Sequence, residues 1–260
     1  MEGIIVSIYF MELYKLFKKK IVWILLIVSL LPFLYASAMY FNLSFISINV
    51  QDKFNCIDYA YVMWNLIIIL GLPTIMYLLI GSNTVSSELE GGQMRMLLTR
   101  ICSRKKLLVY KFLTISTLVS IFCITCLITS TVAYYLFVVK TSYANGMFLS
   151  EDTLAIISSV LLSNLEILFL IALTFLFGIR MKSYSTFLVT LGIFIVLKIF
   201  GNVPYLKVIM PGYISGFSNF VGLSSGSLLL KLAIYFILLM IYIFFTFKMT
   251  LYKFNRMDVS

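Results

Sequence analysis

Histidine is absent from this chain of 260 residues, and charged side chains make up only 12% of it. Without histidine, neither a histidine-ligated metal site nor a histidine general base can form. A Gly-x-x-x-x-Gly-Lys-Ser/Thr phosphate loop is also missing, because no glycine is followed directly by lysine. No apolar run contains two carboxylates, which argues against paired-acid chemistry within those runs. We therefore expect no catalytic residue and no metal site in this chain.

Long apolar runs dominate what remains. Hydrophobic residues make up 62% of the chain and the mean hydropathy is +1.07, whereas soluble domains are about half apolar. A run of about 20 apolar residues spans a bilayer, and a continuously apolar run satisfies its backbone in lipid as a helix. The sequence predicts an all-α polytopic membrane protein, a single domain over residues 1–260, with a kink at Pro73. Its six predicted transmembrane helices cover residues 21–41, 59–85, 108–139, 153–178, 184–200 and 228–247.

The net charge of +10 predicts the orientation of these helices. With both termini inside, fifteen of the twenty lysines and arginines fall on the inner side, as the positive-inside rule requires. A nucleic-acid surface would need a solvated basic patch on a soluble fold, so we expect a lipid bilayer and no nucleic acid as partner. Usage rich in Ile, Lys, Phe and Asn suggests an AT-rich bacterial genome, hence a bacterial cytoplasmic membrane. The five outer lysines are Lys53, Lys140, Lys198, Lys207 and Lys231.

Residues 1–20 allow two interpretations. The lysine triplet at 18–20, followed by an apolar run and small residues at 36–38, resembles a signal peptide with its cleavage site. The leading segment is, however, long and itself patterned, with apolar residues over most of a predicted helix. We favour an interfacial helix along the inner leaflet, followed by an uncleaved first span. Its charged stripe comprises Glu12, Lys15 and Lys19.

Residues 86–107, between the second and third runs, carry charges in an ordered sequence. Two acids come first, Glu88 and Glu90, and Gly91 and Gly92 follow. An idle loop between two spans needs no such order, so the segment predicts a short helix on the inner face that another protein binds. The bases that follow the glycines are Arg95, Arg100, Arg104, Lys105, Lys106 and Lys111.

This order of features resembles the permease subunits of type 2 ABC transporters, the ABC-2 family. The family pattern has an acid, a polar residue, Gly and Thr, then an apolar stretch, Arg-Pro-x-Ser-Arg and a later Lys. Two positions depart from it: Gln93 stands where Thr is usual, and Ile101 where Pro is usual. The matching residues are Glu88, Gly92, Arg100, Ser103, Arg104 and Lys111.

The resemblance implies an interfacial elbow helix at 1–20, a cytoplasmic coupling helix within 86–107 and a re-entrant outer hairpin at 201–227, between the fifth and sixth spans. The chain would be no enzyme: two copies of a separate ATPase subunit would bind ATP-Mg, and a second permease, identical or similar, would complete the path. Export of an antimicrobial peptide, antibiotic or other amphipathic molecule is implied, as in resistance or bacteriocin immunity. The alternative is a non-transporting membrane anchor or sensor whose loop recruits a regulator. The implied ATPase-coupling residues are Glu88, Glu90, Gly91, Gly92, Arg95, Arg100, Arg104 and Lys111.

Glu166 lies in the middle of the fourth apolar run. A charged side chain there costs about 2.5–3.5 kcal/mol on insertion scales, so it should face protein or water. Helical spacing places Ser159, Ser163 and Glu166 on one face, with Asn164 nearby. One hypothesis is a substrate path that receives a cationic or polar group of the cargo. The other is a buried hydrogen bond that joins two helices.

Overall fold

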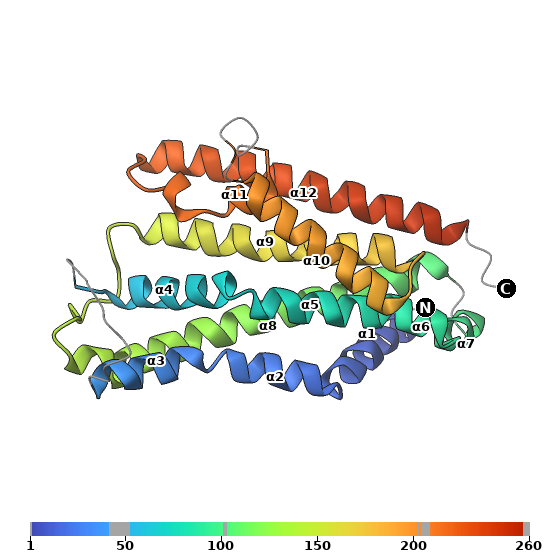
Figure 1. The fold of residues 1–260 in the computed structure, drawn as a ribbon, viewed down its shortest axis with the longest axis horizontal. Helices are drawn as coiled ribbons and strands as arrows, with labels where there is room; N and C mark the ends of the chain where they lie inside the picture. The colour runs from blue at the N-terminus through green and yellow to red at the C-terminus, as the bar shows by residue number, and fades with distance from the viewer. Residues whose placement is uncertain (1, 42–52, 101–102, 202, 204–208, 257–260) are drawn as a thin grey trace.

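All regular secondary structure in the described part of the chain is helical. The computed structural model describes residues 2–41, 53–100, 103–201, 203 and 209–256, and within them the one β-bridge joins Phe54 and Ala144. The helices run side by side along the long axis of the molecule (Figure 1). The prediction of an all-α protein is confirmed.

Fifteen helical elements follow one another along the described residues, and η marks the π- and 3-10 helices. They are α1 (Glu2–Phe17), α2 (Lys20–Val28), α3 (Leu31–Tyr40), α4 (Cys56–Ile69), α5 (Leu72–Ser82), η1 (Asn83–Ser87), α6 (Glu88–Glu90), α7 (Gln93–Arg100), α8 (Arg104–Leu136), η2 (Val138–Lys140), α9 (Thr153–Gly178), α10 (Ser183–Phe200), α11 (Pro211–Ile214), η3 (Phe217–Asn219) and α12 (Ser225–Asn255).

Within the described residues, five stretches of helix are long and apolar enough to cross a membrane. They cover Lys20–Tyr40, Arg104–Lys140, Thr153–Gly178, Ser183–Phe200 and Ser225–Asn255. A sixth span results if α4 and the Leu72–Glu90 segment, which meet at a bend of 54°, count as one broken helix. Length and composition therefore agree with a polytopic membrane protein of five or six helices.

The bend between α4 and α5 has a local cause. Gly71 has a positive φ of 69°, a left-handed conformation that glycine adopts without strain. Pro73 follows in the first turn of α5, where its missing N–H costs no helical hydrogen bond. The kink expected at Pro73 is confirmed, and it separates two helices.

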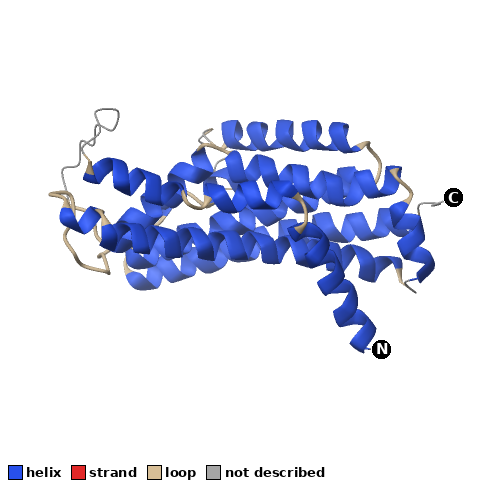
Figure 2. Cartoon of the chain, turned by 90° about the horizontal axis from the view of Figure 1, so that it is seen from below, coloured by secondary structure: helices blue, strands red, loops and turns tan. Residues whose placement is uncertain are grey.

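The two ends of the bundle differ. At one end lie α1, α6, α7 and the C-terminal part of α12, and we call it the α7 end (Figure 1). The opposite end holds the beginnings of α4 and α9, and α11 lies between that end and the middle of the bundle (Figure 1). Helix α1 packs against α8 and slopes out from the side of the bundle near the α7 end (Figure 2). Within the predicted hairpin region, residues 202 and 204–208 lie outside the described structure.

Helix α9 is the hub of the bundle, since it packs against α12, α5, α10, α8 and α4. It approaches η1 so closely at its last residue, Gly178, that an added Cβ would lie 2.9 Å from Ser86 Oγ and 3.4 Å from Val85 Cβ. Ser86 cannot move freely, because its hydroxyl is hydrogen-bonded to that of Thr186 at 3.1 Å. The absence of a side chain at Gly178 therefore sets the distance between α9 and the segment that leads to α6.

We predict that Gly178→Ala lowers the thermal unfolding temperature of the purified protein. The new methyl group would displace Ser86 and break its bond to Thr186, which outweighs the gain of about 1 kcal/mol that alanine brings to a helix. Gly192→Ala is the matched control: Gly192 also lies in a helix, and an added Cβ there meets nothing within 4 Å. Equal or higher stability of Gly178→Ala relative to Gly192→Ala would contradict this account of the packing.

Candidate functional site

Four charged side chains meet at the α7 end, and we call them the charge cluster: Glu12, Lys15, Glu88 and Lys111. The Lys111 ammonium lies 2.6 Å from Glu88 Oε2 and 2.9 Å from Glu12 Oε2. Lys15 approaches the other oxygen of Glu88, Oε1, at 2.8 Å. The cluster joins α1, α6 and α8, which are far apart in the sequence, through charge-assisted hydrogen bonds.

Burial makes this cluster costly to break. The side chain of Lys111 is 0% exposed, and those of Glu12 and Glu88 are almost as deeply buried. An isolated buried charge loses several kcal/mol of solvation, which only close opposite charges restore. Two acids and two bases give the cluster no net charge. At its edge, burial lowers the pKa of the Lys19 ammonium, and the Glu88 carboxylate acts in the opposite direction.

The residues that the resemblance assigns to coupling divide into an inner and an outer set. Glu88 and Lys111 belong to the cluster and are buried, so they support the segment from within. The Oε1 atom of Glu90 accepts a 2.6 Å hydrogen bond from the backbone N–H of Ser183, which ties α6 to the start of α10. Gly91 and Gly92 end α6, with Gly92 at a positive φ of 70°.

Helix α7 buries one side and exposes another. Met94 is completely buried and belongs to the main core, whereas the side chain of Met96 is 67% exposed. Arg104, the first residue of α8, is also exposed. The side chains of Arg95 and Arg100 lie outside the described structure. The segment is therefore anchored in the core through Met94, while Met96 and Arg104 are exposed at its surface.

A second arrangement surrounds Glu166, near the middle of α9. Its Oε1 atom lies 2.8 Å from Lys198 Nζ of α10, and its Oε2 atom accepts a 2.8 Å hydrogen bond from the Ser215 hydroxyl. Ser159, two turns earlier on α9, donates to the backbone oxygen of Ser215 at 2.6 Å. Ser215 lies between α11 and η3, so these contacts fasten the α11–η3 segment to α9 and α10.

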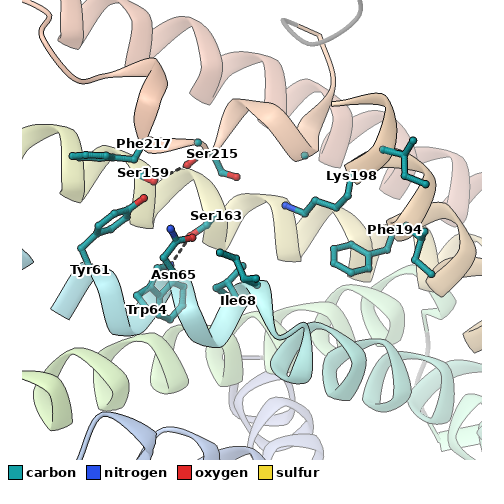
Figure 3. Close-up of a pocket in the computed structure, with 15 residues that line it drawn as sticks. Tyr61, Trp64, Asn65, Ile68, Ser159, Ser163, Phe194, Lys198, Ser215 and Phe217 are labelled. Carbon is teal, nitrogen blue, oxygen red and sulfur yellow. Dashed lines mark hydrogen bonds between the residues drawn. The ribbon is translucent and has the colours of Figure 1, made fainter. Parts of the chain in front are cut away.

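A cavity of about 510 Å³ adjoins this pair (Figure 3). One side of the cavity carries polar groups from α4, α9, α10 and the α11–η3 segment. The side chain of Lys198 extends into the cavity (Figure 3). The remainder of the wall is apolar. The cavity is lined by Tyr61, Trp64, Asn65, Ile68, Ile69, Ser159, Ser163, Phe194, Ile195, Lys198, Ile199, Gly212, Ser215, Gly216 and Phe217.

The structure separates the four residues predicted around a substrate path. Ser159 and Ser163 line the cavity, and Ser163 accepts a 2.9 Å hydrogen bond from the indole N–H of Trp64. Glu166 stands behind Lys198 and is itself buried. Asn164 faces elsewhere: its Nδ2 donates to the backbone oxygen of Val160, and the residue lines a different, apolar cavity of about 620 Å³.

Three residues of this site were not predicted from the sequence: Lys198, Ser215 and Trp64. A signal for Lys198 existed, because it is the one lysine within the fifth apolar run and so a natural counterion for the one acid in the fourth. Helical periodicity identifies a face, but it does not say which neighbouring helix meets that face. Ser215 and Trp64 had no comparable signal.

Other chemistry finds no support in the described residues. No group of three or more cysteine or carboxylate side chains is placed there to share a metal ion. Gly222-Leu223-Ser224-Ser225-Gly226 has the Gly-x-Ser-x-Gly spacing of a hydrolase nucleophile, a motif that needs a strand before the serine. Here Ser224 is the N-cap residue of α12, and no strand precedes it in the described chain.

Comparison with known proteins yields no relative. No family model matches the chain, and no curated protein or solved structure matches it. The charge cluster, the segment beside it and the cavity at Lys198 are therefore the features from which a function can be argued.

We predict that Lys111→Met destabilises the protein by about 3–5 kcal/mol, because it leaves two buried carboxylates facing each other with one counterion fewer. Lys106→Met is the matched control, since Lys106 lies on the same helix and is exposed. Thermal unfolding of both variants in detergent measures the difference. Native-like stability of Lys111→Met would show that the charge cluster does not hold these helices together.

Proposed function

We propose that this chain is the transmembrane permease subunit of an ATP-driven ABC exporter. The observation that carries the proposal is the charge cluster, in which Glu88, next to the acid–glycine–base segment, binds Lys111 of α8 at 2.6 Å. A coupling element must be firmly attached to the helices it moves, and this contact supplies such an attachment. The resemblance in residues 86–111 supplies the identity of the proposed partner.

The proposed mechanism passes through α6 and α8. Helix α8 has 33 residues, about 50 Å at 1.5 Å per residue, so it reaches from the cluster to the opposite end of the bundle. A partner that displaces α6 and α7 would displace Lys111 with them, and α8 and α1 would follow. The π-helix η1, directly before Glu88, is an irregularity of a kind often found at functional sites.

The proposed partner is a separate ATPase subunit, two copies of which bind ATP-Mg, since this chain contains no phosphate loop. Its docking surface would be the face of α7 around Met96, together with Arg104, and the resemblance adds Arg95 and Arg100 to the residues that take part. We place the α7 end and both termini on the cytoplasmic side of a bacterial cell membrane. Helix α1 would serve as the interfacial elbow, and the α11–η3 segment as part of the re-entrant hairpin.

A second permease, a copy of this chain or a similar one, would complete the path. Helices α10 and α12 expose many large apolar side chains, which fits contact with lipid or with such a partner. Export of an amphipathic antimicrobial peptide, antibiotic or related molecule is the function proposed for the assembly. A membrane anchor or sensor would bind its partner through the same segment, but without ATP turnover.

We predict that Met96→Asp weakens ATPase binding while leaving the permease folded, because Met96 is exposed and the substitution places a charge on the docking face. The tagged full-length chain would be purified from its native membrane, and vanadate-sensitive ATP hydrolysis by the copurified complex measured. Met147→Asp is the control, since Met147 is equally exposed at the opposite end. Purification of the wild-type chain without any phosphate-loop protein or ATP hydrolysis would contradict the proposed function.

A further inference from the structure

We propose that the cavity beside Glu166 binds the anionic group of an amphipathic molecule, and that Lys198 recognises this group. The inference concerns a binding site within this chain. Its extension to exported cargo rests on the proposed function, whereas the binding chemistry does not. The argument depends on which end of the ion pair faces the cavity, on the remaining polar groups of the wall, and on the apolar surface opposite.

The Glu166–Lys198 pair presents its positive end to the cavity. Lys198 is among the lining residues and its side chain is 37% exposed, whereas that of Glu166 is 6% exposed and is not part of the lining. Both carboxylate oxygens of Glu166 are occupied, one by Lys198 and the other by the Ser215 hydroxyl. A ligand that enters the cavity therefore meets the ammonium before it meets the carboxylate.

The three serines of the same wall have no hydroxyl proton left to donate to a ligand, whereas Lys198 carries a positive charge. Each hydroxyl has one proton to donate, and all three protons are used within the protein. Ser159 donates to the backbone oxygen of Ser215, Ser163 to that of Val160, and Ser215 to Glu166. Hydrogen bonds from an ammonium to an anion are roughly twice as strong as neutral ones, so Lys198 decides the sign of the preferred ligand.

A cationic ligand is disfavoured by the same geometry. To reach Glu166 it would have to displace Lys198, which is already 2.8 Å from the carboxylate. An anion at Lys198 instead lies nearer to the ammonium than to Glu166, so attraction outweighs repulsion. Glu166 thus orients Lys198, and the cationic cargo group considered from the sequence alone gives way to an anionic one.

The remainder of the cavity suits an apolar body attached to that anion. Ile68, Ile69, Ile195 and Ile199 line it together with Phe194. Few polar groups beside an apolar wall are typical of sites that orient an amphipathic ligand. The shared chemistry is a carboxylate or phosphate on a hydrophobic chain, and its source is either a bilayer lipid or a free amphipathic acid.

The test uses the full chain alone, in phosphatidylcholine nanodiscs without nucleotide. Three photoreactive probes of equal chain length are compared: a diazirine fatty acid, the corresponding fatty alcohol and the corresponding fatty amine. We expect the acid to label cavity-lining peptides of α4 and α9 roughly tenfold more than the amine. Equal labelling by acid and amine, or stronger labelling by the amine, would overturn the inference.

The decisive variant is Lys198→Gln combined with Glu166→Gln, which removes both charges without leaving a buried carboxylate unpaired. It should lose the preference for the acid while its unfolding temperature stays near that of the wild type. Lys140→Gln, in η2 beside α3, is the control and should keep the preference. A folded double variant that still prefers the acid would exclude Lys198 as the recognising group.

A last comparison separates the two sources of the anion. Displacement of the acid probe by phosphatidylglycerol in the nanodisc identifies a bilayer lipid headgroup, and persistence of labelling identifies a free amphipathic acid. Either result keeps the anionic chemistry. Because no ATPase takes part, labelling can succeed while the proposed transport function fails, and the function can hold while labelling fails.

Discussion

The position of one lysine organises the α7 end of this protein. Lys111 is fully buried, and it is stable there because Glu12 and Glu88 approach it from two other helices at 2.9 and 2.6 Å. Removal of any partner would leave an uncompensated charge in an apolar interior, so α1, α6 and α8 must stay together. The acid–glycine–base segment is attached to the bundle by the same contacts, and the proposed coupling to an ATPase depends on this attachment.

The same physical rule recurs around Glu166, with a different consequence. Its partner Lys198 is partly exposed and lines a cavity, so this ion pair is not enclosed in the core as the charge cluster is. Helix α9 contributes Glu166, the partner of Lys198, and contacts η1 at Gly178, next to the charge cluster. One continuous helix therefore links the two polar sites, one at the α7 end and one toward the opposite end. In the proposed exporter, the ATPase would move the charge cluster, and the cavity at Lys198 would contact the cargo.

The helices were predictable, because a continuously apolar run in a membrane must satisfy its own backbone hydrogen bonds and does so as a helix. The run at 153–178 coincides with α9, and Pro73 marks the broken span. The contacts between helices were not predictable, because periodicity assigns a residue to a face without naming its neighbour. Lys198 was assigned to the outer side by charge counting alone, yet it reaches inward to Glu166. Glu12 belonged to a predicted surface stripe, whereas the structure buries it against Lys111.

The central claim is that the charge cluster and α7 lie in the cytoplasm, where an ATPase is available, while the opposite end faces outside. Accessibility of single cysteines in intact cells tests it most directly, in a chain whose Cys56, Cys102, Cys123 and Cys126 have been replaced. An impermeant thiol reagent should label Ser150→Cys in intact cells, and Gln93→Cys only after the cells are permeabilised. Labelling of Gln93→Cys in intact cells would place α7 outside and contradict the account.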